Sequence, residues 1–207
     1  MSVHSSITLA TLGPSGSDSE AAAKSYAAKL VPHTIPYRLE DGVARVGVSI
    51  GGIRTAKVEL HPTYKDAIDS LVAGGSDLAV VASAAHDLSD YIFGKPYRAI
   101  KINGFFMHPT DEILFVRRKG IVKVRSVALY PATRPLVKGE YKIVASVSKS
   151  QAAEDCLECR ADAAVITTRS YDPNKFDVVE RYGAFMMSWN VFIRKDNPRA
   201  HILSGIR

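Results

Sequence analysis

The sequence contains only two cysteines and one tryptophan among its 207 residues. A chain of this length buries enough apolar surface to need neither disulfides nor a metal to hold its core. It also lacks a long apolar run: the longest, from Leu78 to Ala85, is far shorter than the roughly 18 residues that a membrane span needs. The apolar stretch from Ile7 to Leu12 has no Lys or Arg ahead of it, which is unlike a secretion signal. We therefore expect a cytoplasmic protein without membrane association.

Acidic residues are fewer than basic ones: 21 Asp and Glu stand against 27 Lys and Arg, which gives a net charge of +6. The excess gathers between Arg117 and Lys142, where Glu140 is the one acid among the basic residues Arg117, Arg118, Lys119, Lys123, Arg125, Arg134, Lys138 and Lys142. This run is either a solvated face or a positive field that attracts a small anionic substrate. Few aromatic residues alternate with these charges, so nucleic-acid binding is not expected.

The two cysteines, Cys156 and Cys159, are three residues apart in a stretch with helical character. A pair with this spacing can bind a metal or do redox chemistry, but a second pair or a histidine partner is missing from the sequence. We expect reduced cysteines that pack on a helix, and no bound metal or cofactor.

A unit of helix, tight turn, Asp and apolar strand occurs twice. It spans 63–81, with a helix that ends at Gly74-Gly75, and 148–166. Strands that alternate with helices predict an α/β protein with mostly parallel sheets. The repeated unit predicts two lobes with a cleft between them. We expect the first lobe to span 1–85, with 195–207 returning to it, and the second to span 86–194.

Further strands are expected at Val43–Ile50, Ile53–Leu60, Ile113–Val116, Val124–Leu129, Tyr141–Ala145 and Asn190–Ile193. The first two of these flank Gly51 and Gly52, which is the pattern of a β-hairpin.

Three turns place hydroxyl side chains at the expected start of a helix. They contain Ser15, Ser17 and Ser19; Thr133; and Ser148 and Ser150. Ser17 with Glu20 also fits a capping box. Helix N-termini offer unpaired N–H groups and a partial positive charge, which suit carboxylate or phosphate. Three such turns in a two-lobed protein predict a cleft for a multiply charged small anion.

The first of these turns resembles a known motif. The segment Thr11–Ala22, with Gly13-Pro14-Ser15-Gly16-Ser17-Asp18-Ser19 at its centre, is similar to the Gly-Pro-x-Gly-Thr-x-Ser loop of prephenate dehydratases. Segments near Leu78–Ala82 and 148–164 resemble later parts of the same catalytic domain. The resemblance implies the two-lobed fold of type II periplasmic binding proteins, with prephenate between the lobes and Ser15, Gly16, Ser17 and Ser19 among its contacts. Because the chain stops at Arg207, no ACT regulatory domain is expected.

Two departures from the dehydratase pattern point to a narrower resemblance. The Thr-Arg-Phe motif is replaced by Ser188-Trp189-Asn190, and a Glu-Asn-Ser segment is replaced by 83–87. The block from Met186 to Phe192 is similar to the Met-Ser-Trp-x-x-Phe block of the prephenate decarboxylases of the bacilysin, aeruginosin and salinosporamide pathways. That resemblance implies removal of the ring carboxylate without aromatisation, no cofactor, and a homodimer.

Such a reaction needs a proton for a ring carbon. His86 is the first candidate for the acid because histidine exchanges protons near neutrality, and His108 is the second. Ser188 keeps a hydroxyl in the place of the dehydratase Thr, and Trp189 would offer an apolar face to the ring. The remaining expected substrate contacts are Ser83, Thr133, Ser148, Ser150 and Asn190, with Arg134 and Arg169 as possible carboxylate clamps. A structural role for each of these residues, a dehydratase, and an anion-binding protein without catalysis are the alternatives.

Overall fold

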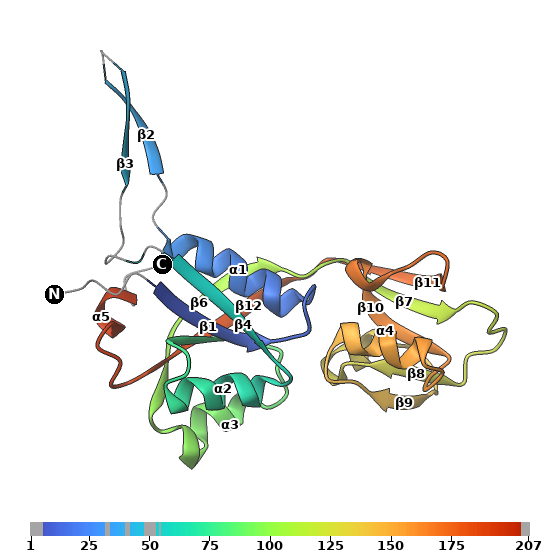
Figure 1. Ribbon diagram of the computed structural model, residues 1–207. Helices are drawn as coiled ribbons and strands as arrows, with labels where there is room; N and C mark the ends of the chain where they lie inside the picture. Colours follow the sequence, from blue (N-terminus) through green and yellow to red (C-terminus); the bar gives the residue numbers. More distant parts are fainter. Residues whose placement is uncertain (1–5, 32–33, 40–41, 48–52, 54, 204–207) are drawn as a thin grey trace.

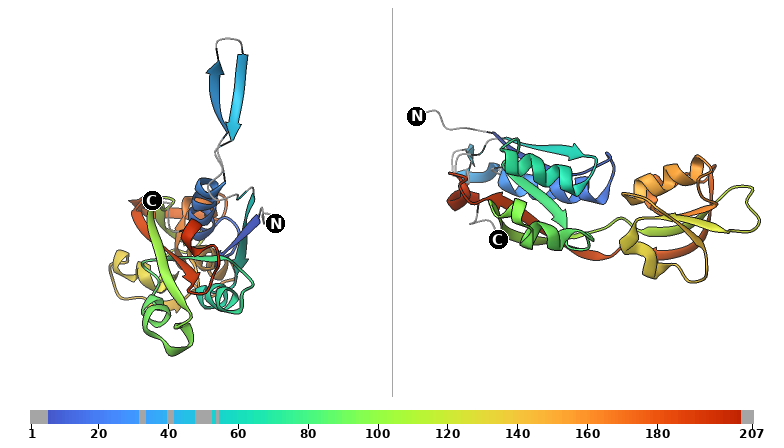
Figure 2. Two further views of the ribbon diagram at one scale, coloured as in Figure 1. Left: turned by 90° about the vertical axis from the view of Figure 1, so that its left-hand side faces the viewer. Right: turned by 90° about the horizontal axis from the view of Figure 1, so that it is seen from below.

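The computed structural model describes residues 6–31, 34–39, 42–47, 53 and 55–203. Its strands form two five-stranded sheets that lie at opposite ends of an elongated molecule, and a separate two-stranded sheet (Figures 1 and 2). In this part of the chain, none of the helices is long and apolar enough to span a membrane.

The first sheet has the strand order β4-β1-β5-β12-β6. Its strands are β1 (Ser6–Leu12), β4 (Thr55–His61), β5 (Leu78–Ala82), β6 (Ile100–Pro109) and β12 (Met186–Arg194). The helices around it are α1 (Asp18–Leu30), α2 (Tyr64–Ala73), α3 (Leu88–Phe93) and α5 (Ala200–Leu203). Helices α1 and α2 cover opposite faces of the sheet (Figure 1). All residues of β5 are buried, because both faces of this strand are covered.

The second sheet has the strand order β11-β7-β10-β8-β9. Its strands are β7 (Ile113–Arg118), β8 (Ser126–Leu129), β9 (Lys142–Ala145), β10 (Ala163–Thr167) and β11 (Phe176–Gly183). Helix α4 (Lys149–Leu157) packs on β8 and β10, and the short helix η2 (Pro131–Leu136) connects β8 to β9. Two further short helices are η1 (Lys95–Tyr97) and η3 (Thr168–Ser170).

The chain crosses between the two sheets twice, after β6 and before β12. The crossings lie side by side (Figure 1) and are joined by two hydrogen bonds. The Thr110 N–H donates to the Phe185 carbonyl oxygen at 2.9 Å, and the Phe185 N–H donates to Thr110 Oγ1 at 3.0 Å. The strands that carry the chain out and back are therefore neighbours that run in opposite directions.

Both repeated helix–strand units form as predicted. Thr63 caps α2 by accepting from the Asp66 N–H, and Ser148 caps α4 by accepting from the Gln151 N–H. Helix α2 ends at Gly74, whose φ of 80° is the left-handed conformation that favours glycine. The capping box of α1 forms in part: Ser17 accepts from the Glu20 N–H, but the Glu20 carboxylate accepts from the Gly16 N–H instead of returning to Ser17.

The sheets are mixed instead of mostly parallel. Strand β1 runs parallel to β4 and β5, and β8 runs parallel to β9 and β10. Strand β12 is antiparallel to β5 and β6, and β7 is antiparallel to β10 and β11. The first sheet also takes β6 and β12 from the range 86–194, which the sequence assigned to the second lobe. The boundary between the two lobes, as defined by the sheets, therefore lies at the two crossings. The chain leaves the first sheet after β6 and returns to it at β12.

The predicted hairpin between Val43–Ile50 and Ile53–Leu60 is wrong. Strand β3 (Gly42–Gly47) pairs antiparallel with β2 (Thr34–Leu39), and β4 pairs with β1. The predicted turn at Gly51 and Gly52 lies outside the described residues. The β2–β3 sheet stands away from the first sheet (Figures 1 and 2).

Candidate functional site between the two sheets

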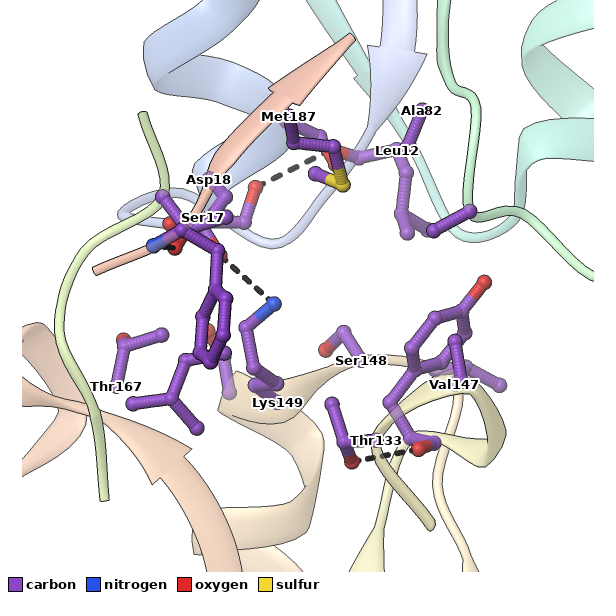
Figure 3. A pocket seen from close by; sticks show the side chains of 18 of the residues that line it. Leu12, Ser17, Asp18, Ala82, Thr133, Val147, Ser148, Lys149, Thr167 and Met187 are labelled. Atoms are coloured by element: carbon purple, nitrogen blue, oxygen red, sulfur yellow. Dashed lines mark hydrogen bonds and ion pairs between the residues drawn. The ribbon is translucent and has the colours of Figure 1, made fainter. Parts of the chain in front are cut away.

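A pocket of about 230 Å³ lies between the two sheets. The first sheet and its helices contribute Leu12, Ser17, Asp18, Ser19, Tyr64, Ala82, Ala84, Met187 and Trp189. The second sheet, its helices and the crossings contribute Thr110, Ile113, Tyr130, Ala132, Thr133, Pro135, Leu136, Val147, Ser148, Lys149, Ser150, Thr167 and Phe185. The pocket is therefore apolar in much of its wall and has hydroxyl groups at several points around it (Figure 3).

The start of α1 brings two of the predicted hydroxyls to the pocket, Ser17 and Ser19. Ser19 Oγ lies 2.8 Å from the hydroxyl of Tyr64, the first residue of α2. Burial raises the pKa of Tyr64 well above its ordinary value. The phenol therefore stays protonated at neutral pH and meets a ligand as a neutral hydrogen-bonding group.

The start of α4 and the η2 helix supply the hydroxyls from the other sheet. Ser148 is the N-cap of α4 and Ser150 is the second residue of that helix. Thr133 donates a hydrogen bond to the Tyr130 carbonyl oxygen at 2.7 Å. The Tyr130 hydroxyl is buried and pairs with no side chain among the described residues. Burial raises the pKa of Tyr130. The structure thus brings five of the predicted hydroxyl residues together at one pocket: Ser17, Ser19, Thr133, Ser148 and Ser150.

One buried ion pair crosses the pocket. Lys149 Nζ lies 2.8 Å from Asp18 Oδ2, with the Asp18 side chain 5% and the Lys149 side chain 15% exposed (Figure 3). Asp18 Oδ1 also accepts a hydrogen bond from the Asp111 N–H at 2.8 Å. Neither Asp18 nor Lys149 was predicted as a site residue, although each lies next to serines that were.

Strand β12 brings the predicted tryptophan to the same pocket. Trp189 is buried, and its indole Nε1 donates to the His108 carbonyl oxygen at 3.4 Å. Met187, two residues earlier on the same face of the strand, and Phe185 at the crossing also line the pocket. These side chains provide an apolar wall beside the hydroxyl groups.

Several predicted site residues lie outside the pocket lining. Ser188 and Asn190 point to the other side of β12, where both donate to Ser83 Oγ, at 2.8 and 2.9 Å. Ser15 and Gly16 bond to the Glu20 carboxylate behind the α1 turn. These five residues are Ser15, Gly16, Ser83, Ser188 and Asn190, and as placed they are neighbours of the pocket wall without being part of it.

Neither predicted histidine lines the pocket. His86 is exposed, and its ring lies 6.3 Å from the ring of Tyr130, which does line it. His108 is half-buried on β6, and desolvation lowers its pKa. Among the described residues that line the pocket there is no histidine, so the titratable groups there are Asp18, Lys149 and tyrosines.

The predicted carboxylate clamps and the basic run also lie elsewhere. Arg134 is exposed and donates to the Val137 carbonyl oxygen, and Arg169 pairs with Asp111 at 2.8 Å. Arg117 in the basic run pairs with Asp177 on β11. Both cysteines are free thiols, with Cys156 buried and Cys159 exposed. Among the described residues, no cluster of three or more His, Cys, Asp or Glu could hold a metal ion.

No family model matches the chain. A curated relative, prephenate decarboxylase from Planktothrix agardhii (strain NIVA-CYA 126/8), is 24% identical over 148 residues, which are 66% of this chain and 72% of the relative.

Two solved structures share the fold at 15% sequence identity. A prephenate dehydratase from Arthrobacter aurescens, in complex with L-Phe, has a TM-score of 0.56 over 91% of this chain. The match covers 60% of that structure, so the chain spans less than two thirds of its length. The periplasmic VFT2 domain of BvgS from Bordetella pertussis has a TM-score of 0.54, over 99% of this chain and 94% of the domain.

The chain therefore has the two-lobed α/β fold expected from its sequence and shared with these solved structures, with a pocket between its two sheets. Both resemblances found in the sequence agree with these comparisons, because the curated relative is named a prephenate decarboxylase and one of the two solved structures is a prephenate dehydratase.

Proposed function

We propose that the protein is a prephenate decarboxylase that removes the ring carboxylate and leaves the ring non-aromatic. One observation carries the proposal. The two sequence motifs of the resemblance, about 170 residues apart, meet at one pocket, where Ser17 and Ser19 from the first lie with Trp189 from the second. The relative named prephenate decarboxylase supports the same reaction.

The reaction breaks the bond between the ring and its carboxylate and releases CO2. The electron pair of that bond shifts into the ring diene, and a proton adds to a ring carbon, so the product is a dihydro-4-hydroxyphenylpyruvate. A dehydratase would instead need an acid at the ring hydroxyl. The lining of this pocket offers protonated phenols, aliphatic hydroxyls and an apolar wall, with its charges paired to each other. This lining suits a reaction that leaves the hydroxyl in place.

The apolar wall would favour loss of the carboxylate. Trp189, Met187 and Phe185 exclude water from one side of the pocket, and transfer of a carboxylate from water to such a site weakens its solvation. The hydroxyls and N–H groups at the starts of α1 and α4 would hold the side-chain carboxylate of the substrate. The substrate would therefore bind with its two carboxylates in different surroundings.

The source of the ring proton is the open step. His86 stays the first candidate because it is open to solvent and its ring lies 6.3 Å from the ring of Tyr130, which lines the pocket. A relay would require the imidazole to reach the Tyr130 hydroxyl, which pairs with no side chain among the described residues. If that relay operates, His86→Gln lowers kcat by the 10²- to 10⁴-fold that a general acid contributes, and KM changes little. An unchanged kcat would exclude His86 as the donor.

The test of the function is the product formed from pure prephenate. We expect CO2 and a keto acid that retains the hydroxyl, identified by NMR, with one solvent deuterium on a ring carbon when the reaction runs in D2O. Phenylpyruvate as the main product would make the protein a dehydratase. We further propose that the product serves the biosynthesis of a non-proteinogenic amino acid, as in bacilysin-type pathways, and that the enzyme is a cytoplasmic homodimer.

A small-anion-binding protein without catalysis is the second candidate. The match to the BvgS VFT2 domain covers nearly all of both chains, and the described lining of the pocket contains no histidine acid. This candidate predicts that prephenate raises the melting temperature in a saturable way without being consumed. Turnover at enzymatic rates would exclude it.

A further inference from the structure

The pocket contains one ion pair, Asp18–Lys149, which has no role in the proposed reaction. Asp18 and Lys149 are the charged residues among the described residues that line it. They begin helices that pack on different sheets, and their side chains meet at 2.8 Å inside the pocket (Figure 3). Their formal charges cancel, so the Lys149 ammonium has a carboxylate of the protein itself as its counter-ion.

A contribution to the stability of the fold does not by itself explain why this ion pair is buried. Removing two charges from water costs free energy that their attraction often fails to recover, and apolar residues of similar volume commonly do as well. The opening motif does not demand the pair either, because Asp18 occupies a variable position of the Gly-Pro-x-Gly-Thr-x-Ser pattern. The pair is thus a feature of this chain that calls for another explanation.

The hydrogen-bonding capacity of the two residues differs. A lysine ammonium has three N–H donors, and Asp18 is the one partner that the structure gives to Lys149 among the described residues. At least two donors remain for a ligand. Asp18 Oδ1 accepts a hydrogen bond from the Asp111 N–H, whereas Asp18 Oδ2 is in ion-pair distance of Lys149 Nζ without a hydrogen bond between them. A carboxylate ligand offers acceptors and needs donors, so of the two residues Lys149 is the one that can bind it, and Asp18 holds the ammonium in place.

We propose that Lys149 binds a carboxylate of the ligand and that Asp18 is the residue that positions it. The identification of the ligand as prephenate, a dicarboxylate, rests on the proposed function; the carboxylate subsite itself rests on the pair. The carboxylate would bind between the Lys149 ammonium and the hydroxyls of Ser148 and Ser150 on either side of it in the chain. The negative charge of Asp18 opposes the incoming anion while it orients the ammonium.

The opposite effects of the two residues provide the test. Lys149→Met removes the anchor, so we expect KM for prephenate to rise at least tenfold, with a smaller change in kcat. Asp18→Asn removes the opposing charge and keeps a hydrogen-bonding side chain, so we expect KM to stay the same or fall. A pair that only ties the two lobes together would respond equally to both substitutions, and an equal loss of affinity in both variants would overturn the proposal.

A loss of folding in Lys149→Met is separated from a loss of binding by the double variant. Lys149→Met alone leaves the Asp18 carboxylate buried without its partner, whereas Asp18→Asn with Lys149→Met leaves two neutral side chains. We expect the double variant to recover the melting temperature of the wild type but not its affinity. Recovery of both would overturn the proposal. Lys65→Met, which breaks the exposed ion pair with Asp69, is the control and should change neither.

A second readout separates this proposal from the proposed function. Phenylpyruvate is a monocarboxylate that the enzyme need not convert, and its binding can be followed by calorimetry in the wild type and each variant. Binding that depends on Lys149 without CO2 release from prephenate would refute the decarboxylase and support the subsite. CO2 release by Lys149→Met with the kcat/KM of the wild type would refute the subsite and support the decarboxylase.

Discussion

The hydroxyl oxygens of Ser19 and Tyr64 lie 2.8 Å apart, and both side chains are buried at the edge of the pocket. Ser19 is in the first turn of α1, and Tyr64 is the first residue of α2. The hydrogen bond therefore joins the beginnings of two helices that cover opposite faces of the same sheet. It also fixes the orientation of two hydroxyls that a ligand would meet.

Tyr64→Phe tests this bond. The substitution removes the phenol hydroxyl and leaves the Ser19 hydroxyl buried without that partner, so we expect a loss of about 1–2 kcal/mol in the free energy of unfolding. Ser19 would also lose its orientation, and KM for prephenate should rise several-fold. Urea denaturation and steady-state kinetics measure the two effects. A variant that is as stable and as active as the wild type would show that the bond is dispensable.

Trp189 is expected to matter for both the fold and the reaction. Trp189→Ala would leave a cavity at a site that is 1% exposed, which typically costs about 3–5 kcal/mol. Trp189→Phe keeps an aromatic ring, but the smaller ring reaches less far toward the ligand. We expect kcat/KM to fall about tenfold, which corresponds to the free energy of one lost aromatic contact. Phe105→Leu on the adjacent strand is the control, because Phe105 is 73% exposed and outside the pocket. Equal activity of Trp189→Phe and the control would remove Trp189 from the site.

Ser188 and Asn190 should tolerate substitution better than their place in the motif implies. Both side chains bond to Ser83 on the side of β12 away from Trp189. We expect Ser188→Ala and Asn190→Ala to change kcat/KM by no more than about twofold, the range of ordinary surface substitutions. A hundredfold loss in Ser188→Ala would instead support the role that the sequence predicts for its hydroxyl.

The turn before α1 depends on Gly16. Its φ of 82° lies in the left-handed region, where a Cβ costs about 1–2 kcal/mol. A Cβ there would also lie 3.4 Å from Cδ of Arg169. We expect Gly16→Ala to lower the stability by this amount and to weaken ligand binding, since Ser17 and Ser19 follow directly. Gly104→Ala is the matched control: a Cβ there meets nothing within 4 Å, so its melting temperature should stay within about a degree or two of the wild type.

The two cysteines should differ in reactivity. Burial raises the pKa of the Cys156 thiol to about 11, whereas Cys159 is exposed. A thiol reagent at pH 8 should modify Cys159 at once and Cys156 only after unfolding. Simultaneous modification of both in the native protein would contradict the buried position of Cys156.

The same pKa shift predicts a pH dependence of stability. The folded protein holds the Cys156 proton more tightly than the unfolded chain does, so its contribution is complete below the ordinary thiol pKa of about 8.5. The contribution declines as the pH rises from there to about 11. Cys156→Ala should flatten this part of the stability curve, and Cys159→Ala should leave it unchanged.

Local sequence signals predicted much of the fold. Thr63, Ser148 and Gly74 mark helix ends by capping chemistry, which acts over a few residues and can be read without knowledge of tertiary contacts. Strands β2, β6 and β11 were missed. Most side chains of β6 and β11 are half-buried or exposed, without the alternation of buried and exposed residues that marks a strand in the sequence, and each of these two strands lies at the edge of its sheet.

The parts of the site that consist of local sequence motifs could be predicted, whereas contacts between residues far apart in the sequence could not. Hydroxyl-rich turns and the Trp189 block were recognisable in the sequence, and five of the hydroxyl residues meet at the pocket with Trp189. The Asp18–Lys149 pair joins residues 131 positions apart, and no local pattern specifies such a contact. Adjacent residues of a strand face opposite sides of the sheet, so Ser188 and Trp189 cannot both face the pocket. Which of the two does so depends on the pairing of β12 in the sheet, and this pairing is not visible in the sequence.

The paired crossings at Thr110 and Phe185 have a consequence for how a substrate enters. Two unconnected segments would allow the halves of the molecule to twist about either one, whereas these two segments are joined by hydrogen bonds. We therefore expect any relative motion of the halves to be a rotation about this one pair of segments, which would open and close the pocket between the sheets.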